Sequence, residues 1–151
     1  MLAQAAHQLG LRVGRRGLEG AIRDVEVCQR IEEGDLTPTL LRLEMRSDRT
    51  PASIRLEYRT VGQRLREKVG GRWESTGDDD FDAEYRVRAV DDVGLRWLTP
   101  HRRDALLAIS DEVERLSISD GVVTAWYEGH PESGRDLAGT VYRLLAVVEP
   151  S

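Results

Sequence analysis

Residues 39–46 read TLLRLEMR and residues 52–60 read ASIRLEYRT, and these two stretches decide the fold class. The first alternates apolar with charged residues, Leu41, Leu43 and Met45 against Arg42, Glu44 and Arg46. The second does the same, with Ile54, Leu56 and Tyr58 against Arg55, Glu57 and Arg59. Side chains along a strand point alternately to opposite faces, so this period predicts strands with one buried and one wet face. We expect the two strands to lie beside each other, with cross-strand ion pairs between their charged rows.

Three further stretches alternate in the same way, namely residues 21–31, 63–69 and 80–90, the second less cleanly. In residues 80–90 the apolar side is formed by Phe81, Ala83, Tyr85, Val87 and Ala89, opposite Asp82, Glu84, Arg86 and Arg88. Glycine, aspartate and proline separate the alternating stretches, as turns require. The series therefore predicts an antiparallel sheet.

Helical spacing appears at both ends of the chain and once between the strands. Residues 1–9 read as a short helix that stops at Gly10, and Thr99-Pro100 reads as an N-cap followed by proline in the first turn. Leu116 and Ile118 begin a strand, and Ser119-Asp120-Gly121 predicts a hairpin turn. A last helix, with Ser133 as its capping candidate, carries a wide apolar stripe formed by Leu137, Val141, Leu144, Leu145 and Val148.

The order of these elements predicts one α+β domain over residues 1–151. We expect an antiparallel sheet of five or more strands, two longer helices packed on one face, and a short N-terminal helix. The chain has 151 residues, 40% of them hydrophobic, which is typical of a soluble globular domain. No apolar run approaches the roughly 20 residues that span a bilayer.

The charge is acidic overall and unevenly distributed. The chain has 22 basic and 27 acidic residues and a net charge of -5. Residues 1–72 carry an excess of basic side chains, and residues 73–151 a larger excess of acidic ones. A net acidic protein is not expected to bind nucleic acid strongly. All the basic residues except Lys68 are arginines, which a GC-rich genome explains, as does selection for bidentate contacts with anions.

Residues 77–82, GDDDFD, form the most distinctive local motif. Asp78, Asp80 and Asp82 are spaced like the first ligands of a calcium-binding loop. The pattern then fails, because Ala83 stands where that loop needs glycine and Ala89 where it needs glutamate. We interpret the motif as a turn in which aspartates cap backbone N–H groups. The alternative is a metal-dependent hydrolase that uses the acidic turn at residues 78–84.

Motifs for other chemistry are missing from the sequence. The three histidines lie in separate segments without metal-ligand spacing, and neither a dinucleotide fingerprint nor a P-loop occurs. A single cysteine, Cys28, excludes an intrachain disulfide and a cysteine-based zinc cluster. We therefore predict no catalytic residue and no cofactor.

The second half of the chain contains an ordered set of motifs. They are Thr76-Gly77-Asp78 with Phe81-Asp82 and Tyr85, Leu98-Thr99-Pro100 with Arg103 and Leu106-Leu107, and Ser119-Asp120-Gly121. In these motifs the chain resembles a group of uncharacterised bacterial proteins, in which an α+β domain of unknown function often follows N-terminal membrane segments. The resemblance implies a bacterial origin and the α+β fold. We expect a cytoplasmic location, with membrane association on the cytoplasmic side only through a segment absent from this chain.

The charged face of the predicted sheet is the surface with a case for function. It would expose the arginines Arg42, Arg46, Arg55, Arg59, Arg86 and Arg88 among Glu44, Glu57 and Glu84. Arginine is enriched at protein interfaces and lysine is depleted there. We predict a non-enzymatic binding or scaffold module that associates through this face with another protein or with itself. The alternative for the same face is weak binding of nucleic acid or another anion.

Overall fold

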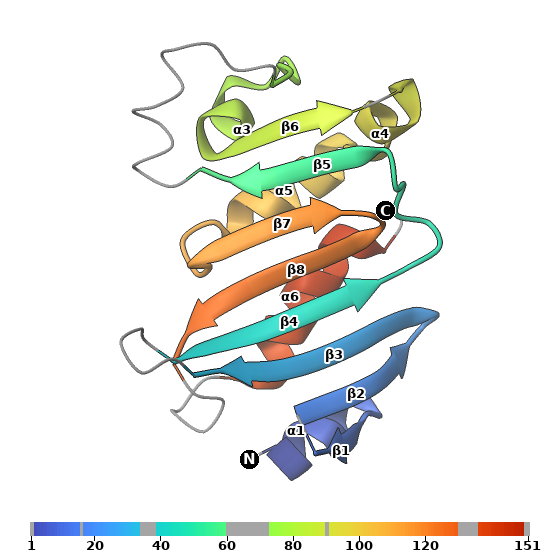
Figure 1. The fold of residues 1–151 in the computed structure, drawn as a ribbon, viewed down its shortest axis with the longest axis vertical. Coiled ribbons are helices and arrows are strands. Elements are labelled where there is room, and N and C mark those ends of the chain that lie inside the picture. Colours follow the sequence, from blue (N-terminus) through green and yellow to red (C-terminus); the bar gives the residue numbers. More distant parts are fainter. Residues whose placement is uncertain are drawn as a thin grey trace.

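The computed structural model describes residues 2–15, 17–33, 39–59, 73–89, 91–129 and 136–149. They form an antiparallel sheet of eight strands and five helices (Figure 1). The strands are β1 (Arg12–Gly14), β2 (Gly17–Ile22), β3 (Val25–Glu32), β4 (Leu40–Arg46), β5 (Ile54–Tyr58), β6 (Tyr85–Ala89), β7 (Arg115–Ser119) and β8 (Val122–Glu128). The helices are α1 (Leu2–Leu9), α3 (Asp79–Glu84), α4 (Asp92–Trp97), α5 (Pro100–Ile109) and α6 (Leu137–Val148). The predicted α+β class is confirmed.

The strands follow the order β1-β2-β3-β4-β8-β7-β5-β6 across the sheet. The prediction that residues 39–46 lie beside residues 52–60 is therefore wrong, because the β7–β8 hairpin lies between β4 and β5 (Figure 1). Alternation fixes which face a side chain joins, but it does not fix which strand lies next to it. The hairpin itself is confirmed, with Asp120 at φ 53° and Gly121 at φ 78°, the left-handed pair that a tight two-residue turn requires.

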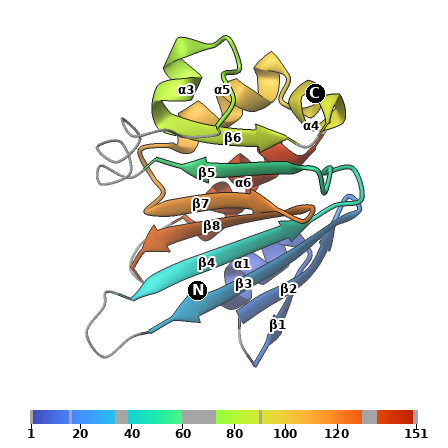
Figure 2. The same ribbon diagram turned by 45° about the horizontal axis from the view of Figure 1, so that its top comes forward.

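All the described helices lie on one side of the sheet. Figures 1 and 2 show α5 and α6 behind the strands, and α1 packs near α6 at the β1–β2 end. Helix α4 approaches β5 and β6 so closely that a Cβ on Gly94 would lie 3.1 Å from Cβ of Ile54 and 3.2 Å from Cβ of Ala89. The prediction of two longer helices on one face and a short N-terminal helix is confirmed.

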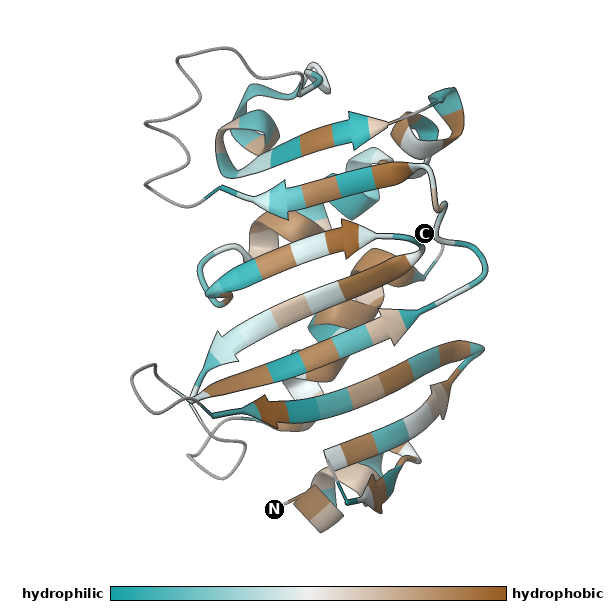
Figure 3. Ribbon diagram, viewed as in Figure 1, coloured by the Kyte–Doolittle hydropathy of each residue, from teal (hydrophilic) through white to brown (hydrophobic). Residues whose placement is uncertain are grey.

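The core lies between the helices and the apolar rows of the strands. Figure 3 shows hydrophobic and hydrophilic residues alternating along β4, β5 and β6. Leu43, Leu56 and Val87 are fully buried, as are Val141 and Leu144 of α6. On this face the side chains pack in one continuous hydrophobic cluster.

Tyr85 joins the sheet to the helix layer. Its hydroxyl donates a hydrogen bond of 2.6 Å to the carbonyl oxygen of Leu106 in α5, and its ring stacks on Phe81 at 5.1 Å. Burial raises the pKa of this hydroxyl, chiefly by desolvation of the charged form. It therefore remains a neutral donor.

Two predicted strands were wrong in extent. Residues 21–31 are divided between β2 and β3 by a turn at Arg23 and Asp24. Residues 80–90 begin as helix α3, because Asp78 accepts a hydrogen bond from the backbone N–H of Phe81 and so caps a helix rather than a turn. Of the described residues in this stretch, 85–89 are strand, and Phe81 is buried as expected.

The helix starts were predicted unevenly. Thr99 caps α5 as expected, with its hydroxyl accepting from the N–H of Arg102. Helix α4, which Asp91 caps, was not predicted. Asp136 caps α6, whereas the predicted cap Ser133 and the predicted strand at residues 63–69 lie outside the described residues. None of the described helices combines the length and the apolar character that crossing a bilayer requires.

Candidate functional site

The side of the sheet opposite the helices is called the open face. It is formed by the side chains that alternate along each strand with those of the hydrophobic core, and no described element covers it. Its central part comprises Glu26, Cys28 and Arg30 of β3, Arg42, Glu44 and Arg46 of β4, Val122, Thr124 and Trp126 of β8, Arg115, Ser117 and Ser119 of β7, Arg55 and Glu57 of β5, and Arg86 and Arg88 of β6. Of the six arginines proposed from the sequence, Arg59 alone lies outside a strand, just beyond the end of β5.

Cross-strand ion pairs occur on the open face, but with other partners than expected. Arg86 of β6 pairs with Glu57 of β5, with a distance of 3.1 Å from Nε to Oε2. Arg42 pairs with Glu32 of β3 at 3.1 Å and with Glu44 of its own strand. Because β7 and β8 separate β4 from β5, the two predicted charged rows do not meet.

Two tryptophans fix the planes of neighbouring arginines. The guanidinium carbon of Arg115 lies 3.9 Å from the ring centroid of Trp126, and that of Arg42 lies at 5.8 Å on the same ring. Trp73 likewise holds Arg86 at 4.3 Å and Arg88 at 5.0 Å. Stacking on an aromatic face orients a guanidinium and leaves its edge N–H groups free to bind.

Trp73, Trp126 and Arg115 were not predicted as part of this surface. Arg115 directly precedes the alternating Leu116 and Ile118, so its position on the open face was available from the sequence pattern. Trp126 lies between the buried Ala125 and Tyr127 and is itself only 8% exposed, which makes it resemble a core residue. Trp73 joins the sheet through a single bridge that its neighbour Glu74 makes with Val87.

Four arginines of the open face, Arg46, Arg55, Arg88 and Arg115, are exposed and have no carboxylate partner among the described residues. Glu26 lies opposite Arg46 in the register without forming an ion pair with it. Arg55 and Arg88 face each other directly across β5 and β6. Two like charges in such positions destabilise a sheet. With Arg46, these two arginines make one of the two basic rows of the open face, and Arg30, Arg42 and Arg115 make the other.

A hollow of about 590 Å³ lies at the β1–β4 end of the open face. Its lining includes Glu19, Glu26, Cys28 and Arg46, together with Val122 of β8. The Cys28 thiol accepts a hydrogen bond of 3.2 Å from Nε of Arg30, and this contact raises the pKa of the Arg30 guanidinium. The hollow thus continues the open face toward β2 and β1.

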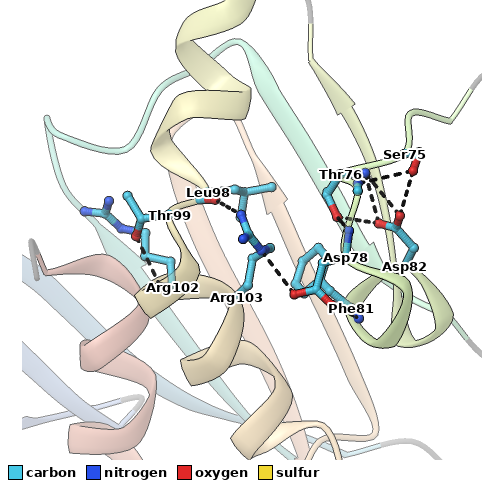
Figure 4. Close-up of polar contacts among 10 residues, drawn as sticks. Ser75, Thr76, Asp78, Phe81, Asp82, Leu98, Thr99, Arg102 and Arg103 are labelled. Atoms are coloured by element: carbon cyan, nitrogen blue, oxygen red, sulfur yellow. Dashed lines mark hydrogen bonds and ion pairs between the residues drawn. The ribbon is translucent and has the colours of Figure 1, made fainter.

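The acidic motif forms a structural network rather than a metal site (Figure 4). Asp82 accepts hydrogen bonds from the hydroxyls of Ser75 at 2.9 Å and Thr76 at 2.7 Å. Asp78 caps α3 and accepts from Nε of Arg103 in α5 at 3.3 Å. Among the described residues, no three His, Cys, Asp or Glu side chains converge in a way that could hold a metal ion. The alternative ligand set Asp78, Asp80 and Asp82 is therefore not assembled.

The architecture defines a broad class, an α+β domain with an antiparallel sheet covered by helices on one side. No protein-family model matches the chain, and no curated protein matches it. Among solved structures, the chain is similar to the crystal structure of the mycobacterial trehalose monomycolate transport factor A, with a TM-score of 0.50 and 13% sequence identity. The match covers 97% of this chain and 88% of that chain. At this identity the likeness concerns the fold.

Proposed function

We propose that the protein is a non-catalytic binding module that recognises another protein through the open face. The observation that carries this proposal is an antiparallel sheet with helices on one side and arginines and tryptophans on the other. Folding requires the apolar side chains on the helix side of the sheet to be buried. It does not require arginines stacked on tryptophans on the opposite side. Arginine and tryptophan are the residue types that contribute most to protein interfaces.

The mixture of charges favours a protein over a nucleic acid as the partner. Glu44 and Glu57 lie in the row between the more basic rows of the open face, and Glu26 lies opposite Arg46. A phosphate backbone carries negative charge at regular intervals and would meet these carboxylates. A protein surface can place an acidic group on one row and a neutral or basic group on the next.

Self-association through the open face is less favourable than binding another protein. A two-fold contact would bring the same face together with itself. On the central part of this face the arginines outnumber the glutamates, so such a contact would oppose like charges. The similar transport factor fits a non-enzymatic role, but the proposal depends on the open face rather than on that likeness. The membership in the bacterial group described above stays a prediction.

Charge reversal on the open face tests this proposal. We expect Arg46→Glu with Arg55→Glu to abolish the recovery of specific proteins when the purified chain is used for quantitative affinity capture from its own cells. Both side chains are exposed, so the midpoint of thermal unfolding should stay nearly unchanged. The recovered proteins are quantified by mass spectrometry against the unmodified chain.

The matched control reverses an arginine on the helix side. Arg96 of α4 is exposed, and Arg96→Glu changes the net charge in the same direction. It should leave the recovered proteins unchanged. Equal recovery by the unmodified chain, the control and the double variant would contradict a role for the open face.

A further inference from the structure

We propose that Arg55, Arg88 and Arg46 form a docking row for an extended acidic segment of the partner protein. This inference rests on the proposed function and specifies the chemistry of the partner. It begins from the direct opposition of Arg55 and Arg88 across β5 and β6. Facing β-carbons in an antiparallel pair are about 5 Å apart, so one carboxylate can reach both guanidinium groups. Such a carboxylate would relieve the repulsion between them.

The neighbouring residues prepare Arg88 for this contact. Trp73 stacks on the guanidinium groups of both Arg86 and Arg88, while Glu57 holds Arg86 by an ion pair. Arg86 is thereby occupied, and Arg88 is oriented without a carboxylate of its own among the described residues. An oriented guanidinium loses little conformational entropy on binding.

Arg46 lies at the other end of the same row. In the register, Arg46 faces Val122, and Val122 faces Ser119, which belongs to the strand next to β5. Three strand spacings of about 4.8 Å place Arg46 about 14 Å from Arg55. In an extended peptide, residues four positions apart span nearly the same distance. An acidic segment that crosses the strands could therefore place one carboxylate at each end of the row.

The side chains in the middle of the row are short, and one of them is apolar. Val122 and Ser119 are short and half-buried, so they leave room for a side chain between the two arginine positions. Val122 also belongs to the lining of the 590 Å³ hollow. The preferred segment thus has an apolar residue between two acidic ones that are four positions apart.

Carboxylates fit this row better than a polyphosphate does. The adjacent row contains Glu44 and Glu57, about 7 Å away along the strands. The hollow beyond Arg46 is lined by Glu19, Glu26 and Glu44. A continuous polyanion would approach these groups, whereas a short acidic segment on a single row would not. Nucleic acid is therefore one of the outcomes that the experiment must separate.

Fluorescence anisotropy with a labelled synthetic peptide tests the inference. The probe is a peptide of about twelve residues that contains Glu-Thr-Val-Thr-Glu, whose β-branched residues favour the extended form, titrated at about 50 mM and about 300 mM salt. We expect saturable binding at the lower salt that weakens at the higher salt. Arg55→Glu with Arg88→Glu should weaken it about tenfold, or about 1.4 kcal/mol.

Three controls separate charge recognition from a folding defect. Arg55→Gln with Arg88→Gln removes the charges without reversing them and should also weaken binding. A peptide with lysine in place of both glutamates should bind the Arg55→Glu, Arg88→Glu variant better than it binds the unmodified chain. Arg96→Glu, on the helix side, should leave the affinity for the acidic peptide unchanged.

Three results would overturn the inference. They are the absence of saturable peptide binding up to about 1 mM, equal affinity in the charge-reversed variant, and tighter binding of a DNA duplex than of the peptide at the same salt. If the peptide fails while affinity capture still depends on Arg46 and Arg55, the acidic chemistry is wrong and the proposed function stands. If both fail, the open face is solvated surface.

Discussion

Replacing Arg102 by alanine should lower the free energy of unfolding by about 3 kcal/mol. The side chain extends from the first turn of α5 and is only 7% exposed. Its guanidinium donates to the carbonyl oxygens of Val147 at 3.0 Å, Trp97 at 2.9 Å and Glu149 at 3.4 Å. These carbonyls end α6 and α4, where intrahelical donors are lacking. One arginine therefore caps two helices.

The surroundings of Arg102 explain why we expect a large loss of unfolding free energy. Arg102 also stacks on Trp97 at 4.7 Å, and desolvation by burial lowers the pKa of its guanidinium. Truncation would leave buried acceptors without donors and a cavity beside the ring. Arg102→Lys keeps the charge but lacks the planar fork, so about half of the effect should remain.

Urea unfolding followed by circular dichroism measures these changes. The control is Arg96→Ala, because Arg96 is exposed on α4 and its Nε makes only a long bond of 3.3 Å to the Asp92 carbonyl. This variant should shift the free energy of unfolding by less than about 0.5 kcal/mol. A shift below about 1 kcal/mol for Arg102→Ala would show that the two helix ends do not depend on this side chain.

Truncation of Leu144 should be about as damaging, at roughly 2–5 kcal/mol. Leu144 is fully buried in α6, the helix that packs against the middle of the sheet. Alanine would remove its contacts and leave a cavity, because the neighbouring core residues relax only in part. The same unfolding measurement applies.

The neighbouring Arg143 provides the control for this helix. It is exposed and forms a surface ion pair of 3.1 Å with Glu112, so Arg143→Ala should cost no more than about 1 kcal/mol. If Leu144→Ala were equally mild, α6 would not be part of the core. It would then be a candidate docking element in its own right.

Local signals in the sequence were sufficient for several elements. Thr99-Pro100 and Asp120-Gly121 each combine a backbone preference with the correct neighbours, and the structure has a helix start and a hairpin there. Residues 80–84 carried two conflicting signals. Alternation favoured a strand, but the cap from Asp78 was stronger, since it satisfies backbone donors within the same short segment.

The order of strands depended on contacts that no local pattern carries. The β7–β8 hairpin inserts between β4 and β5, so pairing joins residues such as Leu43 and Ala125 that are far apart in sequence. The candidate site, in contrast, was predicted in part. Five of its six predicted arginines do lie on strands of the open face, because a two-residue period assigns faces well. The stacking of Trp73 on Arg88 required the tertiary structure.

Site-specific photo-cross-linking tests the central claim, that the open face is where a partner binds, most directly. Cys28 is the only cysteine, so Cys28→Ser allows a photoreactive maleimide to be placed at Ser119→Cys on the open face or at Tyr142→Cys on α6. Tyr142 is 46% exposed, which makes it a fair reference for the helix side. When the labelled chain is irradiated in an extract of the protein's own cells, we expect a discrete adduct from position 119 that is lost with Arg46→Glu and Arg55→Glu, and none from position 142. An adduct from position 142 alone, or one from position 119 that survives the charge reversal, would contradict it.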